Sequence, residues 1–73
     1  MLPSKSLVMS RADHVETYQR HRTHALAALR FISGADYREL PSESRAELRE
    51  TFVDEMCAAQ YHYTAAMLLG ETE

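Results

Sequence analysis

Four side chains near the start of the sequence could together bind an anion. His14, Tyr18, His21 and Arg22 lie on one side of a helix, because residues three and four positions apart are neighbours on its surface. Arginine offers five donors in a planar fork that suits phosphate, and tyrosine and histidine can stack on a base or donate to phosphate. The spacing predicts a pocket for a nucleotide-like anion. The alternative is that Tyr18 belongs to the core, Arg22 pairs with a glutamate of a second helix and the histidines face solvent.

The same residue types do not predict a metal centre or a catalytic pair. His21 and His24 are three apart, but such a pair holds zinc only with further ligands from elsewhere, and nothing in the spacing demands them. Cys57 and His62 are five apart, so on a helix their side chains point roughly 140° apart and cannot form a thiolate–imidazole pair. There is no glycine-rich phosphate loop and no serine elbow. We therefore expect a protein that is not an enzyme and that holds no metal or cofactor.

The composition bounds what these side chains can belong to. With 73 residues, of which 45% are hydrophobic, the chain is one small folded domain. A single cysteine excludes an intrachain disulfide and fits a reducing compartment. The net charge is −3, but the first 33 residues hold five basic and two acidic side chains, and the remainder holds three and nine. An acidic chain is a poor candidate for duplex DNA, whereas a local anion site on the first half is allowed. The alternative is that the two halves pack antiparallel and their charges complement each other.

No segment has the pattern of a signal peptide or a membrane span. Residues 1–10 lack a long apolar run. Residues 56–70 carry no formal charge, yet they are too few and too polar for a span of ~20 apolar residues. We expect a protein in the cytoplasm of a bacterial host cell, with no membrane partner.

A first helix over about residues 10–33 would position the candidate anion site. Ser10 is a suitable N-cap, and Asp13 falls in the first turn, where an acid suits the helix dipole. No glycine or proline interrupts the stretch, and Gly34 follows as a C-cap. The connection after it has room for one helical turn around residues 36–39.

A second helix is predicted over about residues 42–69. Ser42 can cap it, with Ser44 and Glu47 as an alternative capping box, and Gly70 ends it. The fold class is therefore all-α, a hairpin of two long antiparallel helices. The chain divides into a flexible or partner-packing arm (1–9), a helical-hairpin domain (10–70) and a polar tail (71–73).

The apolar residues of the second helix exceed what one partner helix can cover. The face predicted on the first helix comprises Val15, Tyr18, Arg22, Ala25, Leu29 and Ile32. The main face of the second helix comprises Leu48, Phe52, Met56, Ala59, Tyr63, Ala66 and Met67, and its second face comprises Val53, Cys57, Tyr61 and Leu68. The surplus predicts self-association into a four-helix bundle dimer or a higher oligomer. The oligomer interface is expected to include Phe52, Val53, Met56, Cys57, Tyr61, Tyr63, Met67 and Leu68.

The order of several residues resembles a known family. The first helix contains E-x-Y-x-x-x-R-x-x-A, with Tyr18 and Arg22 at its centre. The second opens with Ser44-Arg45, continues with Thr51 and Asp54-Glu55, and ends in an alanine-rich uncharged stretch. This layout resembles small phage-encoded proteins that sequester the cyclic oligonucleotide signals of bacterial CBASS immunity. The resemblance implies a non-enzymatic helical oligomer that holds its ligand at subunit interfaces, with Tyr18, Arg22 and Arg45 as ligand contacts.

Three functions remain open at this level. The first is an inhibitor, of the kind found in phages and mobile elements, that binds and occludes a host defence or regulatory protein through an acidic face formed by Glu47, Glu50, Asp54 and Glu55. The second is a sponge that sequesters a cyclic nucleotide signal. The third is a small RNA- or DNA-binding hairpin whose phosphate contacts would be Lys5, Arg11, Arg20, Arg22 and the histidines. We favour the first.

Overall fold

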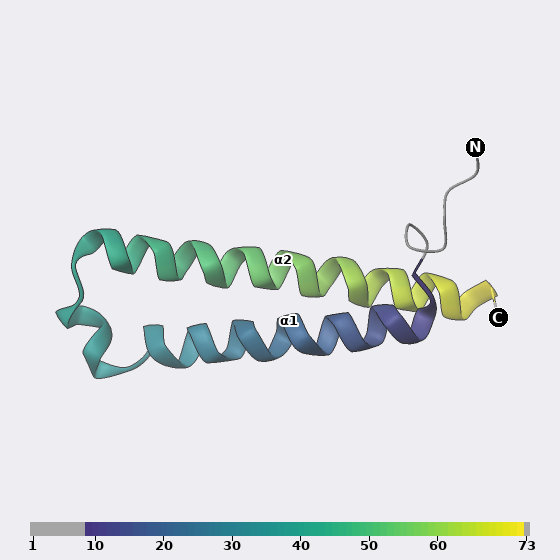
Figure 1. Cartoon of the computed structure of the whole chain (residues 1–73), viewed down its shortest axis with the longest axis horizontal. Helices are drawn as coiled ribbons and strands as arrows, with labels where there is room; N and C mark the ends of the chain where they lie inside the picture. The colour runs from purple at the N-terminus through teal and green to yellow at the C-terminus, as the bar shows by residue number, and fades with distance from the viewer. Residues whose placement is uncertain (1–8, 73) are drawn as a thin grey trace.

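The protein folds as an antiparallel hairpin of two long helices. The structure, a computed structural model, describes residues 9–72. Helix α1 spans Arg11–Ile32, a short 3-10 helix η2 spans Ala35–Glu39, and helix α2 spans Ser42–Thr72. The start of α1 and the end of α2 lie at the same end of the hairpin (Figure 1). The all-α hairpin and the helical turn between its arms are confirmed, and the predicted N-terminal arm lies outside the described residues except for its last residue.

Both ends of α1 have clear local causes. The Ser10 side chain accepts a hydrogen bond from the backbone N–H of Asp13 at 3.1 Å, which confirms the predicted N-cap. At the other end the N–H of Ser33 donates to Leu29 O at 2.9 Å, and the N–H of Gly34 donates to Phe31 O at 3.0 Å. Gly34 itself is extended, with φ −82° and ψ 165°. The prediction of a glycine C-cap is wrong here, because the helix ends without any left-handed residue.

Helix α2 continues through Gly70 to Thr72, so the predicted end at residue 69 is wrong by three residues. Gly70 faces the start of α1, where an added Cβ would lie 3.0 Å from Arg11 Nε. The glycine therefore leaves room for the Arg11 side chain and does not terminate α2. At the start of α2, the N–H of Arg45 donates to Pro41 O at 3.0 Å. The predicted start at residue 42 is confirmed, but Ser42 is the first helical residue and not the N-cap that we predicted.

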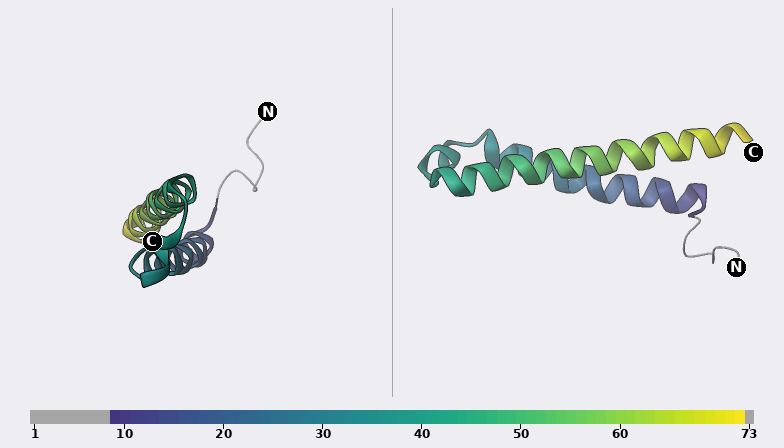
Figure 2. Two further views of the ribbon diagram at one scale, coloured as in Figure 1. Left: turned by 90° about the vertical axis from the view of Figure 1, so that its left-hand side faces the viewer. Right: turned by 90° about the horizontal axis from the view of Figure 1, so that it is seen from above.

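The hairpin is a single layer of helices with almost no enclosed core. It measures 50 × 26 × 13 Å, and its smallest dimension is close to the ~10–12 Å diameter of one helix (Figure 2). Among the described residues, the buried apolar side chains are all alanines: Ala25, Ala28, Ala59 and Ala66. His14 is buried with them. Small side chains let the helices approach closely, and every larger side chain keeps part of its surface in water.

The contact between the helices follows the apolar faces predicted from the sequence only in part. The buried and half-buried positions on α1 include His14, Tyr18, His21, Ala25, Ala28 and Ile32, and those on α2 include Leu48, Phe52, Glu55, Ala59, His62 and Ala66. Arg22 and Leu29 were expected in this seam, as were Met56, Tyr63 and Met67, and all five are exposed. Alanines and polar pairs fill the middle of the seam beside half-buried side chains such as Tyr18 and Phe52, and part of each predicted apolar face lies outside it.

The second apolar face of α2 stays uncovered, as predicted. Val53, Cys57, Tyr61 and Leu68 are all exposed. Neither helix, over the residues described, is long and apolar enough to cross a bilayer.

Candidate functional site

All four histidines of the chain gather with one glutamate along the seam. We call His14, His21, His24, His62 and Glu55 the histidine–glutamate cluster. The antiparallel register explains how it forms. His14 and His21 are seven residues apart on α1, and Glu55 and His62 are seven apart on α2. The register that places His14 beside His62 therefore also places His21 beside Glu55.

The two histidines at one end of the cluster share a single proton. His14 Nδ1 lies 2.8 Å from His62 Nδ1, and their ring centroids are 5.0 Å apart. A nitrogen-to-nitrogen hydrogen bond needs one donor and one acceptor, so only one of the two Nδ1 atoms can carry a proton along this contact. The His62 ring also stacks on His21, with centroids 5.9 Å apart and planes 6° apart.

Glu55 anchors the other end of the cluster. His21 Nδ1 donates to Glu55 Oε2 at 2.5 Å, and His24 Nδ1 lies 3.7 Å from Glu55 Oε1. The side chain of Glu55 keeps only 22% of its surface exposed. Glu55 therefore belongs to the seam, whereas the other three members of the predicted acidic face remain on the surface: Glu47, Glu50 and Asp54.

The environment of His62 favours its neutral form. Desolvation in the seam is the main cause that lowers the pKa of His62 below 6.5, and the charges of His14 and His21 lower it further. The cluster shows no geometry for metal chemistry, since no three His, Cys, Asp or Glu side chains among residues 9–72 are placed to hold one ion. Cys57 lies on the exposed side of α2. The arrangement is suited to fixing the register of the two helices and to responding to protons.

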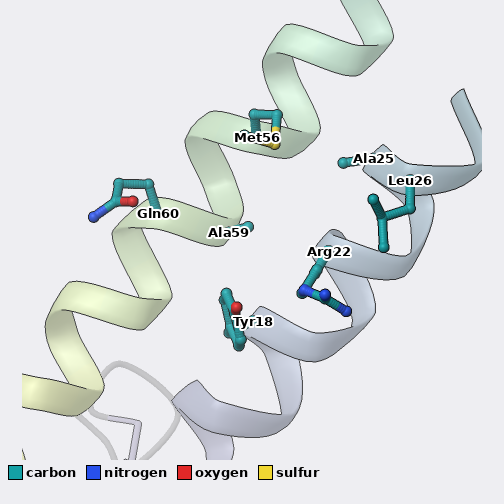
Figure 3. A pocket seen from close by; sticks show the side chains of 7 residues that line it. All are labelled: Tyr18, Arg22, Ala25, Leu26, Met56, Ala59 and Gln60. Atoms are coloured by element: carbon teal, nitrogen blue, oxygen red, sulfur yellow. The ribbon is translucent and has the colours of Figure 1, made fainter. Parts of the chain in front are cut away.

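A separate groove of about 270 Å³ runs beside the seam, between the middle of α1 and the middle of α2. Its lining residues are Tyr18, Arg22, Ala25, Leu26, Met56, Ala59 and Gln60 (Figure 3). The Tyr18 ring faces the space between the helices and packs on Tyr63, with centroids 5.4 Å apart. The Gln60 side chain turns away from the groove and donates to Thr64 Oγ1 at 2.9 Å. The groove is thus mainly apolar and aromatic, with one cation.

Arg22 is that cation, and it has no carboxylate partner within the described part of the chain. The ion pairs found there join Arg20 to Glu16 and Glu55 to two histidines. The alternative in which Arg22 pairs with a glutamate of the second helix is therefore wrong. An exposed guanidinium beside an aromatic ring keeps all five of its donors available to an external anion.

The other candidate ligand residues lie elsewhere in the single chain. His14 and His21 belong to the cluster in the seam, so they are not the solvent-facing groups of the alternative reading. Arg45 lies near η2, where Tyr37 OH donates to its carbonyl oxygen at 3.5 Å. Its Nε is buried and, among the described residues, has no hydrogen-bond partner. Of the five predicted ligand residues, the groove brings together only Tyr18 and Arg22.

Comparison with known proteins adds no relative to this description. No family model, no curated protein and no solved structure matches the chain. The function must therefore be argued from the groove, the cluster and the exposed surface.

Proposed function

We propose that this chain is a non-enzymatic binding protein that acts by covering a surface of another protein. The observation that carries the proposal is the distribution of its apolar side chains. The buried apolar positions are alanines, whereas large apolar side chains on α2 are about half exposed, among them Val53, Met56, Tyr63 and Met67. Apolar patches on a small protein mark interaction sites more often than chance exposure.

The exposed acids support the same reading. Glu47, Glu50 and Asp54 remain on the surface of α2, and none of the ion pairs of the described residues includes them. Charged residues on the surface of a binding protein steer a partner and exclude wrong ones. A protein that binds in this way inhibits its partner by occlusion and needs no reacting group, which suits an inhibitor of a host defence or regulatory protein.

A photo-crosslinking residue placed at single positions in the cell tests the proposal. At Met67 we expect one discrete adduct with a second protein, which mass spectrometry then identifies. At Arg20, which faces away from the patch and pairs with Glu16, we expect no such adduct. Equal labelling at both positions, no adduct at Met67, or an adduct at Met67 that contains only a second copy of this chain would each refute the proposal.

Self-association belongs to a different side of α2. Cys57, Tyr61 and Leu68 are exposed and lie about 160–180° around the helix from the buried Ala59. A second copy that packs there would leave the groove open. We expect sedimentation to show a dimer that Leu68→Lys converts to a monomer, with Arg20→Lys as the matched control. A wild-type chain that stays monomeric would exclude this contact.

A second function is favoured by the groove. Arg22 has no carboxylate partner in the described chain, and the groove places it beside Tyr18, as expected for a site that sequesters a nucleotide-like anion. Native mass spectrometry with a mixture of cyclic di- and trinucleotides tests this function. The wild type and Arg20→Gln should gain a nucleotide mass that Arg22→Gln does not gain. If the wild type gains none, sequestration is excluded.

A further inference from the structure

One side of the hairpin combines exposed apolar side chains with an unpaired cation. On α2, Met56, Tyr63 and Met67 are 46–52% exposed and follow the spacing of one helix stripe. On α1, Arg22 and Leu29 are seven residues apart and also exposed. Both stripes lie on the same side, because Arg22 and Met56 line one groove (Figure 3). We call these five residues the apolar–basic face.

This face is positively charged in a chain that is negative overall. Arg22 lies near the middle of α1, and none of the five members of the face is acidic. Asp54 and Glu47 lie about 160–180° around α2 from Met56. The net charge of the whole chain is −3, and these two acids point away from the groove. A partner that matches the face must therefore bring both apolar side chains and negative charge.

We infer that the apolar–basic face docks an amphipathic helix of a partner protein that carries carboxylates among its apolar anchors. The inference rests on the proposed function and names the chemistry of the partner. Two parallel stripes with a groove between them accept a helix whose anchors recur every three and four residues. A carboxylate opposite Arg22 can accept two hydrogen bonds from the planar guanidinium, which fixes the position of the docked helix along the groove.

A second copy of this chain fits the face less well. A two-fold axis through the middle of the face would bring the Arg22 side chains of both copies together in a desolvated contact, and like charges there oppose binding. Docking of the acidic side of one copy onto the apolar–basic face of another would not close and would produce open chains of molecules. A foreign acidic helix satisfies Arg22 without either problem.

Two designed helical peptides with identical apolar anchors test the inference. One carries glutamates and the other carries lysines at the positions beside the anchors. The full chain is labelled at the methionine methyl groups, and the peptides are titrated at physiological salt. We expect the glutamate peptide to shift the Met56 and Met67 resonances and to bind at least about tenfold more tightly than the lysine peptide, a difference of ~1.4 kcal/mol.

Two arginine variants provide the matched comparison. Arg22→Glu should reverse the order of the two peptides, and Arg22→Gln should abolish the preference for glutamate. Arg20→Glu, at an exposed position outside the face, should leave the preference intact. Helical circular dichroism confirms that each variant is folded. Equal binding of both peptides, unmoved Met56 and Met67 resonances, or shifts of these resonances with protein concentration alone would each overturn the inference.

The outcomes separate the inference from the proposed function. If a crosslinked partner is found in the cell but the two peptides bind equally, the acidic-helix inference fails and the binding function stands. If the glutamate peptide binds selectively but Met67 captures no protein in the cell, the face has the stated chemistry and the proposed function fails.

Discussion

Replacing His21 and Glu55 by leucine, singly and together, measures how much the polar contact in the seam stabilises the hairpin. His21 Nδ1 donates to Glu55 Oε2 at 2.5 Å, and the two side chains keep 29% and 22% of their surface exposed. A hydrogen bond to a charged group contributes ~1.5–3 kcal/mol when well shielded. Partial exposure screens this pair, so we expect a coupling free energy of about 1 kcal/mol.

The two single replacements should therefore both be costly, for different reasons. Glu55→Leu leaves the Nδ1–H of His21 in the seam without its acceptor, and His21→Leu leaves a half-buried carboxylate with only the more distant His24. In the double variant, two apolar side chains meet between the helices, and such replacements of buried polar pairs are often neutral or stabilising. We expect the double variant to approach the stability of the wild type.

Thermal and urea denaturation followed by circular dichroism, at pH 7.5 and a fixed protein concentration, measures the free energy of unfolding of the wild type, the two single variants and the double variant. These four values form a double-mutant cycle. A coupling of ~1 kcal/mol corresponds to roughly 4–8 °C in a domain of this size. The exposed pair formed by Arg20 and Glu16, at 3.5 Å, is the matched control, and its coupling should be below about 0.5 kcal/mol. The reasoning is refuted if the two cycles give the same coupling, or if the double variant is less stable than the worse single variant.

Three further predictions follow from single contacts. Because the pKa of His62 is lowered in the fold, the unfolded chain binds more protons than the folded chain below pH 6.5. The free energy of unfolding should therefore fall from pH 7.5 to 5.5 until the folded-state pKa is passed. Urea denaturation at a series of pH values should show a shallower fall for His62→Gln than for the wild type. Ser10→Ala removes the acceptor of the Asp13 N–H and should lower the free energy of unfolding by ~1 kcal/mol, whereas Ser10→Asp should retain the cap. Equal stabilities of the alanine and aspartate variants in urea denaturation would contradict the cap. Gly70→Ala should raise the melting temperature by about 2–4 °C, because an alanine favours the helix by roughly 0.5 kcal/mol and the Arg11 side chain can yield to its Cβ; a lower melting temperature would show that the approach at Gly70 is too tight.

The helices could be predicted because their causes are local. The long stretch without glycine or proline, the N-cap at Ser10 and the break around Pro41 all act within a few residues. The end assigned to Gly70 was wrong because a glycine can also lie inside a helix where another side chain approaches, and the sequence does not distinguish the two cases. At Gly70 the deciding contact is with Arg11, which is almost the whole chain away.

The side of each helix that packs could be predicted only in part from apolar spacing. The rule that the apolar stripe is buried holds for residues such as Ala25 and Ala59. The same rule also selected Arg22, Leu29 and Met56, which are exposed. The missed signal was a matched spacing: His14 and His21 on one helix, and Glu55 and His62 on the other, are both seven apart. The equal spacing produces contacts only when the two helices pack antiparallel in this particular register, and the register is known only from the structure.

The placement of polar groups inside the seam and apolar groups outside it carries the functional argument. A two-helix layer about 13 Å thick cannot enclose large side chains, so its stability must come from close alanine packing and from specific polar contacts. Those contacts fix the register because His14 has a partner only opposite His62, and His21 only opposite Glu55. Because polar contacts inside the seam fix the register, Met56, Tyr63 and Arg22 are not required to set how the two helices align. In the proposed function they form the outer face whose apolar area and single charge select the partner.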